Sequence, residues 1–151
     1  MTEAVIKVSD MVITDEFDTV TEEDSVRQTT EKLLGIPKGV IIVTSPDNQV
    51  SGVITSKEIL QVVARGDDPN EINAQAIMDT DIMEVTESED IENLVEKMKE
   101  RKPHAVVVVN SEGVFKGYFS PNDYREALAK LHQAGNVDYR GVLTKLMKKK
   151  D

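Results

Sequence analysis

A hydroxyl residue followed three positions later by a carboxylate occurs twice in this chain, each time after a short apolar run. Thr55 and Glu58 form the first pair, and Ser120 and Asp123 form the second. At the start of a helix such a pair can act as a capping box, in which each side chain binds a free backbone amide. The same helix end offers amides and partial positive charge to a phosphate, and a carboxylate can hold ribose hydroxyls. The two pairs are therefore candidates both for helix caps and for nucleotide binding.

The two pairs belong to a duplication that covers most of the sequence. Gly52 to Glu58 aligns without a gap with Gly117 to Asp123, 65 residues further on. The same offset places Val20-Thr21-Glu22 on Val85-Thr86-Glu87. Self-similarity at a fixed period indicates a structural unit that is repeated and whose copies pack together. The cleft between two such copies is where we expect function.

Each copy has the pattern of a strand, a helix, two strands and a second helix, which predicts an α/β fold of the α+β type. In each copy, two strand-length apolar runs are separated by turn residues, which predicts a hairpin. Apolar residues at helical spacing come before and after this hairpin. After a first strand that ends near Val20, the expected elements are a helix through Val26 and Leu33, strands Val40 to Thr44 and Val50 to Ile54, a helix from Ser56 to about Ala64, a helix through Ile91 and Met98, strands Ala105 to Val109 and Val114 to Phe119, and a helix from Pro121 to about Ala134.

The duplication also predicts the domain boundaries. We expect residues 8–66 to form the first repeat and residues 74–134 the second, with the polar, turn-forming stretch 67–73 as the linker. Residues 135–151 carry an apolar stripe and end in three lysines and an aspartate, which predicts a C-terminal helical extension with a solvated end.

Composition excludes several classes of function. The net charge of −10 argues against a nucleic-acid backbone as the main partner, because such binding needs Lys and Arg to displace counterions. The chain has no Cys, and its apolar runs are too short to cross a membrane, so we expect a cytoplasmic protein. Its two histidines, His104 and His132, are not in a metal-ligand spacing, and no phosphate-cradling glycine loop is present. Acidic stretches at 15–18 and 79–81 could attract Mg²⁺ but are usually solvated. We do not expect an enzyme.

The paired turns, the order of elements and the repeat length together resemble the tandem cystathionine β-synthase (CBS) domain pair, also called a Bateman module. The likeness extends over roughly residues 9–134, and Met78 to Thr86 is similar to the family's opening stretch. The resemblance implies two repeats that pack through their sheets with pseudo-twofold symmetry. It also implies two clefts, which in relatives bind adenosine nucleotides or related adenosyl compounds.

Carried over residue by residue, the resemblance implies one site for each repeat. In the second repeat Asp123 is expected to hold the ribose and Ser120 the phosphate. The other residues expected at this site are Asn122, His104, Ala105, Asp79 and Ile82. The equivalent set expected for the first repeat is Thr55, Lys57, Glu58, Gly39, Val40, Thr14 and Phe17. Glu58 stands where the family usually has Asp and adds a methylene in front of the ribose, so we expect the Asp123 site to be the better one.

Three functional hypotheses follow, of which the first is favoured. The chain is a regulatory module that senses AMP, ADP, ATP or an adenosyl compound and needs no other cofactor; it is a dimerisation or interaction scaffold with closed clefts; or, as the least favoured, it is a small nucleotide-dependent enzyme. The resemblance also implies a homodimer. A regulatory module of this kind would pass its response to an effector protein that the sequence does not identify.

Overall fold

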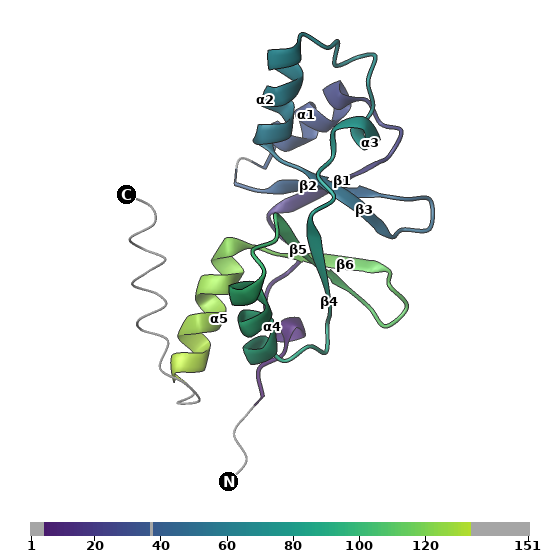
Figure 1. Ribbon diagram of the computed structural model, residues 1–151. Coiled ribbons are helices and arrows are strands. Elements are labelled where there is room, and N and C mark those ends of the chain that lie inside the picture. Colours follow the sequence, from purple (N-terminus) through teal and green to yellow (C-terminus); the bar gives the residue numbers. More distant parts are fainter. Residues whose placement is uncertain (1–4, 37, 134–151) are drawn as a thin grey trace, which may run out of the picture.

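The computed structural model describes residues 5–36 and 38–133 of the chain. Within them, one unit of secondary structure occurs twice, first in the upper and then in the lower half of the molecule in Figure 1. The predicted C-terminal extension, residues 135–151, lies outside the described residues, as does Ala134 at the predicted end of the last helix.

The predicted strands and helices are all present, with boundaries that differ by a residue or two. In chain order the elements are η1 (Val8–Asp10), β1 (Phe17–Thr21), α1 (Val26–Leu34), β2 (Val40–Thr44), β3 (Val50–Ile54), α2 (Ser56–Arg65), α3 (Ala74–Ile77), β4 (Ile82–Thr86), α4 (Ile91–Glu100), β5 (Ala105–Val109), β6 (Phe115–Phe119) and α5 (Pro121–Gln133). Only the short helices η1 and α3 were not expected from the sequence.

The two sheets share one topology. Each has three strands, in the orders β1-β2-β3 and β4-β5-β6. The first two strands of each sheet are parallel and the last two are antiparallel. The antiparallel register shifts between Val43 and Thr44 in the first sheet and between Val108 and Val109 in the second. The duplication therefore extends to this irregularity of the hairpin, which lies at the same place in both repeats.

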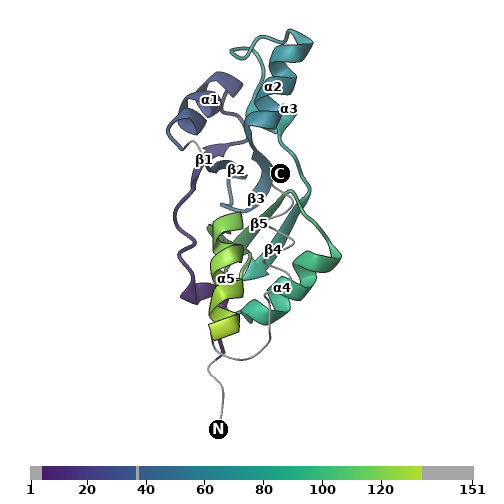
Figure 2. The ribbon, with the colours of Figure 1, turned by 90° about the vertical axis from the view of Figure 1, so that its left-hand side faces the viewer.

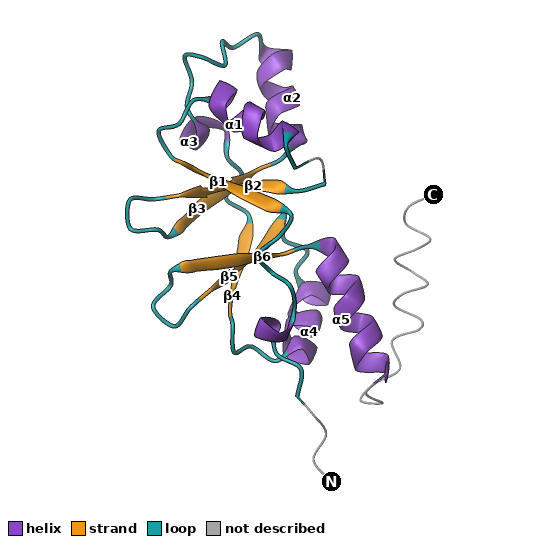
Figure 3. Ribbon diagram, turned by 180° about the vertical axis from the view of Figure 1, so that it is seen from behind, coloured by secondary structure: helices purple, strands orange, loops and turns teal. Residues whose placement is uncertain are grey.

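The sheets face each other, and the helices cover their outer sides, with α1 and α2 on one and α4 and α5 on the other (Figures 1 and 3). The middle strands β2 and β5 are buried over their whole length because each is covered on both faces. Side chains alternate between the faces of a strand, so Val40 and Ile42 point to the opposite sheet while Ile41 and Val43 point to the helices. The core between the sheets consists of Val40, Ile42, Val53, Ala105, Val107 and Tyr118.

The N-terminal segment of the chain packs on the second repeat and not on the first. Val8, Met11 and Ile13 are buried in the same apolar cluster as Leu94, of α4, and Leu128, of α5. Figure 2 shows this segment running from the foot of the second repeat up to β1 of the first. The residues that lead into the first repeat are therefore packed against the helices of the second.

The segments that precede β1 and β4 both bind the hairpin of the other repeat. Before β1, the carbonyl of Ile13 accepts a hydrogen bond from the backbone N–H of Tyr118 in β6, at 2.8 Å. Before β4, Asp79 exchanges two backbone hydrogen bonds with Val53 in β3, at 2.8 and 2.9 Å. A Cβ atom on Gly117 or Gly52 would meet these segments at 2.4 or 2.8 Å, so only glycine allows the close approach. We call these two stretches, residues 13–16 and 78–81, the crossing segments.

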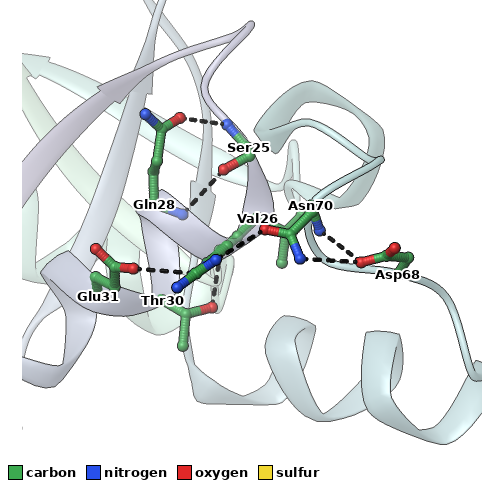
Figure 4. Close-up of polar contacts among 8 residues, drawn as sticks. Ser25, Val26, Gln28, Thr30, Glu31, Asp68 and Asn70 are labelled. Carbon is green, nitrogen blue, oxygen red and sulfur yellow. Dashed lines mark hydrogen bonds and ion pairs between the residues drawn. The ribbon is translucent and has the colours of Figure 1, made fainter.

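The linker between the repeats is bound to the start of α1. The Ser25 hydroxyl accepts a hydrogen bond from the Gln28 amide at 3.0 Å, and the Gln28 side chain binds the Ser25 amide in return. The guanidinium of Arg27 donates to Asn70 in the linker at 3.4 Å, and Asn70 also binds Asp68 (Figure 4). The first turn of α1 therefore binds the linker through the side chain and the backbone amide of Arg27.

Candidate functional site

The turn between β6 and α5 has the predicted capping geometry. The Ser120 amide donates to the Asp123 carboxylate at 2.9 Å, and the Asp123 amide donates to the Ser120 hydroxyl at 3.1 Å. Both side chains are buried, at 2% and 4% exposure. A reciprocal pair of this kind satisfies two of the free amides at a helix N-terminus. It also holds the Asp123 carboxylate in one orientation.

The turn between β3 and α2 uses the same positions with different hydrogen bonds. One oxygen of Glu58 accepts a hydrogen bond from the Thr55 amide at 2.7 Å and another from the Thr55 hydroxyl at 2.8 Å. The extra methylene of Glu58 brings the carboxylate back far enough to meet both donors. The Thr55 hydroxyl therefore donates its proton to Glu58 in addition to its place in the capping box, whereas the Ser120 hydroxyl accepts a hydrogen bond from the Asp123 amide.

Asp123 faces two acids from the crossing segment of the first repeat. One carboxylate oxygen from each of Asp15, Glu16 and Asp123 lies within 4.8 Å of the others. Asn122 donates to Glu16 across this junction at 2.7 Å. Glu16 has a φ of 63°, a left-handed conformation that non-glycine residues seldom adopt. The left-handed residue of this crossing segment thus belongs to an acidic group, formed by Asp15, Glu16 and Asp123, beside the start of α5.

Residues that sequence analysis had expected at the other site lie beside this acidic group. The Val40 amide donates to the Glu16 carbonyl at 3.1 Å, and a Cβ on Gly39 would lie only 2.3 Å from that carbonyl. On the cationic side, the Arg125 guanidinium donates to the Asn122 side chain at 2.9 Å. One cation therefore accompanies the acids at this helix start.

Two pKa values reflect the burial and the negative charge. Burial raises the pKa of Asp123, hydrogen bonds from Ser120 oppose the rise, and the charges of Asp15 and Glu16 add to it. Burial, followed by the charges of Glu16 and Asp123, raises the pKa of Tyr118 to about 12. Both shifts have the direction that a cationic group or a hydrogen-bond donor at this place would reverse.

Glu58 has an imidazole as its neighbour. The Nε2 atom of His104 lies 3.5 Å from Glu58 Oε1, and its Nδ1 atom lies 3.9 Å from Asp79 Oδ2. Asp79 belongs to the crossing segment of the second repeat. The His104 backbone is fixed by a hydrogen bond from its amide to the Asp81 carbonyl at 3.0 Å. Arg101 binds the Asp81 side chain at 2.8 Å and the Ile82 carbonyl at 3.1 Å.

The predicted grouping of the site residues by repeat is wrong. The resemblance implied that His104, Ala105, Asp79 and Ile82 lie with Asp123, but His104 and Asp79 lie beside Glu58. It also implied that Thr14, Phe17, Gly39 and Val40 lie with Glu58, but their segments adjoin Glu16, which binds Asn122 and lies near Asp123. The reason is physical: each crossing segment hydrogen-bonds to the hairpin of the other repeat before it enters its own sheet.

The structure also shows what was missed and where the remaining predicted residues lie. Asp15 is exposed and Glu16 is half-buried, in keeping with the expectation that these acids are solvated, but their position beside a buried carboxylate was not predicted. The paired glycines at 52 and 117 were the signal for this, because each lies where the other repeat's crossing segment approaches. Phe17 makes an edge-to-face contact with Phe115, at 5.2 Å between ring centroids. Ala105 is buried, Ile82 is half-buried, and Lys57 and Thr14 are exposed.

Comparison with known proteins agrees with this architecture. A family model described as CBS domain matches residues 8–65 and 74–130. Among solved structures, a CBS domain protein from Pyrobaculum aerophilum complexed with AMP is 25% identical, with 85% of this chain and 99% of that chain covered and a TM-score of 0.70. A putative acetoin utilization protein from Vibrio cholerae is 16% identical, with coverages of 88% and 97% and a TM-score of 0.72.

A third solved structure, a CBS domain pair/ACT domain protein from Thermotoga maritima, is 22% identical, with coverages of 83% and 98% and a TM-score of 0.66. A search of curated proteins finds no match. Within residues 5–36 and 38–133, no helix combines the length and apolar character needed to cross a membrane.

Proposed function

The chain belongs to the CBS domain family, and from this premise we propose that it is a regulatory module that binds an adenosine nucleotide or adenosyl compound where its two repeats meet. The observation that carries the proposal is the buried pair Ser120 and Asp123 at the start of α5. The carboxylate is oriented by its cap and faces a segment of the other repeat, so a ligand held there contacts both repeats. A similar protein from Pyrobaculum aerophilum was solved in complex with AMP.

Each part of an adenosine ligand has a chemical counterpart around this pair. The Asp123 carboxylate accepts hydrogen bonds from the ribose hydroxyls, and the Ser120 hydroxyl with the Asn122 amide meets a phosphate or an equivalent group. Pro121 has no N–H, and the Asp123 amide is bound by Ser120. Arg125, next to Asn122, supplies positive charge for a phosphate. The residues proposed for the adenine pocket are Thr14, Phe17, Gly39 and Val40, which adjoin the acidic group.

The acids of the crossing segment bear on the choice of ligand. Asp15 and Glu16 place negative charge beside Asp123, and this charge repels a phosphate that approaches them. A nucleotide must therefore direct its phosphate toward Arg125, whereas the cationic sulfonium of S-adenosylmethionine is attracted by the same acids. AMP, ATP and S-adenosylmethionine are the ligands to compare.

We propose that the equivalent site at Glu58 binds such a ligand less well. Its carboxylate already accepts two hydrogen bonds from Thr55 and lies 3.5 Å from His104. A ribose must compete with these contacts and with the imidazole, whereas the Asp123 carboxylate binds the Ser120 amide through Oδ2 and has carboxylates beside it. Residues proposed to line this second site are Asp79, Ile82, His104, Ala105 and Lys57.

Calorimetric titration tests the proposal. AMP, ATP and S-adenosylmethionine are titrated in turn into the wild type, Asp123→Ala and Glu58→Ala. A charged acceptor that binds ribose contributes about 1.5–3 kcal/mol, so Asp123→Ala should weaken binding of the best ligand by about tenfold or more. Glu58→Ala should cost less, and a larger loss from Glu58→Ala contradicts the assignment of the stronger site.

Thermal unfolding separates the regulatory module from the scaffold. A ligand present at 100 times its dissociation constant adds about 2.7 kcal/mol to the free energy of unfolding. If none of the three ligands raises the melting temperature at millimolar concentration, the clefts are closed and the scaffold hypothesis replaces the sensor. Product formation in the same mixtures would show that the chain is an enzyme.

We further propose that the module forms a homodimer through the outer helices of the first repeat. Leu34, Leu60 and Val63 are 77%, 65% and 70% exposed on α1 and α2. Leu60 and Val63 lie one turn apart on the same face of α2, and exposed large apolar side chains that lie together mark interaction surfaces. Static light scattering should give the mass of a dimer, and Leu60→Ser should shift the equilibrium toward the monomer. A monomeric wild type at micromolar concentration contradicts this proposal.

A further inference from the structure

We propose that Glu58, Asp79 and His104 form a binding site for a first-row transition-metal dication such as Zn²⁺. The site is separate from the proposed nucleotide site at Asp123, but it uses Glu58, Asp79 and His104 of the weaker second site, so a metal ion and a nucleotide would compete there. The inference does not depend on the proposed function, because it concerns the chain without any nucleotide.

Three separate parts of the chain bring the ligand atoms together. Glu58 comes from the first turn of α2, Asp79 from the crossing segment before β4, and His104 from the residue before β5. One nitrogen or oxygen atom from each residue lies within 4.8 Å of the others. Imidazole and carboxylate groups are the ligands that zinc takes in sites of mixed nitrogen and oxygen. The set joins both repeats, so an ion bound there connects them directly.

Each ligand residue is held in place by other contacts. The amide and hydroxyl of Thr55 hold the Glu58 carboxylate through Oε1, so an ion binds Oε2 or displaces the hydroxyl. The backbone of Asp79 is paired with Val53 through two hydrogen bonds, and the His104 amide binds the carbonyl of Asp81. Side chains on a fixed backbone lose less freedom when they bind an ion. The site is therefore largely arranged before the metal arrives.

The imidazole of His104 has an unsatisfied atom that faces Glu58. Its Nε2 atom is buried, and the described part of the chain offers it no hydrogen-bond partner. The distance of 3.5 Å to Glu58 Oε1 is long for a hydrogen bond. Two ligands that are each about 2.1 Å from one tetrahedral zinc ion lie about 3.4 Å apart. A buried nitrogen without a partner is costly in a folded protein, and a metal ion between Nε2 and the Glu58 carboxylate removes that cost. Asp79 lies nearest the other ring nitrogen, Nδ1, at 3.9 Å, so its carboxylate binds the same ion only when it turns from Nδ1 toward Nε2.

Charge and chemical softness select the kind of ion. Two carboxylates and a neutral imidazole suit a dication, and the nitrogen ligand favours Zn²⁺, Co²⁺ or Ni²⁺ over Mg²⁺ and Ca²⁺, which prefer oxygen alone. The acidic group at Asp15, Glu16 and Asp123 provides an internal comparison, because it has three carboxylates within the same distance and no imidazole. A transition metal should therefore bind to the cluster that contains His104 in preference to the cluster of three carboxylates.

Titration with metal alone tests the inference. The full-length chain, with any affinity tag removed and no nucleotide added, is titrated with ZnCl₂ by calorimetry, and its melting temperature is followed in parallel. One equivalent should bind and raise the melting temperature. His104→Gln should lose roughly 100-fold or more in affinity, and Asp79→Asn roughly 10- to 100-fold, as is typical when the groups around a metal are removed.

Matched controls make the result specific. His132→Gln removes the only other histidine, and it should bind zinc like the wild type. Glu16→Gln changes the other cluster and should also leave zinc binding unchanged. Titration with CoCl₂ should give the visible absorption of a coordinated ion in the wild type and not in His104→Gln. Unfolding of the metal-free variants checks that each is folded.

Three results would overturn the inference: a wild type that shows no saturable zinc binding, binding that survives His104→Gln, or binding that is lost in His132→Gln or Glu16→Gln. In the first case the imidazole only contacts the two carboxylates directly. In the other two the metal is bound elsewhere on the chain. None of these results affects the calorimetric test of nucleotide binding at Asp123, which is run on metal-free protein.

Discussion

Glu58 and Asp123 occupy equivalent positions at the starts of α2 and α5, and each faces a crossing segment of the other repeat. Their neighbours differ in kind. Asp123 has Asp15 and Glu16 beside it, whereas Glu58 has the imidazole of His104 and only one further acid. The repeated sequence thus fixes where a carboxylate is placed and how it caps its helix. The residues outside the repeated turn decide what the carboxylate can bind.

The two crossings differ as well, in how tightly they are packed. A Cβ on Gly117 would meet the carbonyl oxygen of Ile13 at 2.4 Å and its side chain at 2.8 Å. A Cβ on Gly52 would meet the Asp79 carbonyl at 2.8 Å and the flexible side chain of Met78 at 2.8 Å. The crossing onto the second repeat has less room to adjust than the crossing onto the first.

The largest effect we expect comes from alanine at these two glycines. Overpacking usually costs about 1–3 kcal/mol, and Gly117→Ala should lie at or above the upper end because it meets a backbone carbonyl that Tyr118 binds at 2.8 Å. Gly52→Ala should lie near the lower end, since part of its clash is with the end of the Met78 side chain. Urea unfolding of both variants measures the two losses.

Gly66→Ala serves as a reference for these variants. Gly66 has a φ of 78° and no atom within 4 Å of its Cβ position, so its cost comes from backbone conformation alone. If Gly52→Ala proves more destabilising than Gly117→Ala, the ranking of the two crossings is reversed.

A smaller effect is expected from the caps of α1 and α4, at equivalent positions. The Ser25 hydroxyl accepts from the Gln28 amide at 3.0 Å, and the Asp90 carboxylate accepts from the Glu92 amide at 2.9 Å. Loss of either cap should cost about 1 kcal/mol. Asp90→Ala should cost a few tenths more than Ser25→Ala, because a negative charge at a helix start is also favoured by the helix dipole.

Thermal unfolding in low and high salt measures this pair of variants. The extra cost of Asp90→Ala should shrink in high salt, since the charge is screened. A salt dependence of equal size in Ser25→Ala would show that the difference does not come from the charge of Asp90.

The smallest effect, and the one that depends on pH, is expected from Asp123→Asn. Burial, and then Asp15 and Glu16, raise the pKa of Asp123 above its ordinary 3.8, against the hydrogen bonds from Ser120. The folded protein therefore holds this proton more tightly than the unfolded chain. The contribution of Asp123 to stability is greatest below pH 3.8 and falls as the pH rises through the raised pKa.

An asparagine side chain is neutral at every pH, so Asp123→Asn avoids the cost of a buried charge and should be more stable than the wild type above the raised pKa. The gain should reach only about 1 kcal/mol, because an amide accepts a weaker hydrogen bond from Ser120 than a carboxylate does. The advantage should disappear as the pH falls toward 3.8. Urea unfolding across this pH range measures it. Glu58→Gln should gain less stability, because Glu58 has a histidine and not two acids as its neighbours. An equal gain in the two variants would contradict the electrostatic difference between the two clusters.

The sequence was sufficient for most of the fold because its signals are local and occur twice. Hydrophobic runs such as Val40 to Thr44 and capping residues such as Ser120 determine an element from a few neighbouring residues. Gly52 and Gly117 are different, since each marks a contact with residues far away in the sequence. Alignment of the two copies shows that these glycines are equivalent but does not show what approaches them.

For the same reason the site was predicted only in part. The capping pairs were correctly placed at their helix starts, but their partners were taken from the same repeat. Which segment lies opposite Asp123 is decided by backbone hydrogen bonds such as that from Tyr118 to Ile13, which any side chain at those positions could make. Backbone contacts of this kind cannot be recognised from residue types. The exception is a glycine such as Gly117, whose missing side chain makes room for the contact.

The crossing segments have a consequence for how the molecule is assembled. Each sheet is completed at its hairpin by a stretch of chain that belongs to the other half, as the bonds from Tyr118 to Ile13 and between Val53 and Asp79 show. The arrangement is that of a domain-swapped dimer whose two subunits have been joined into one polypeptide by a short covalent link. A half-length chain would therefore find its missing edge only on a second molecule.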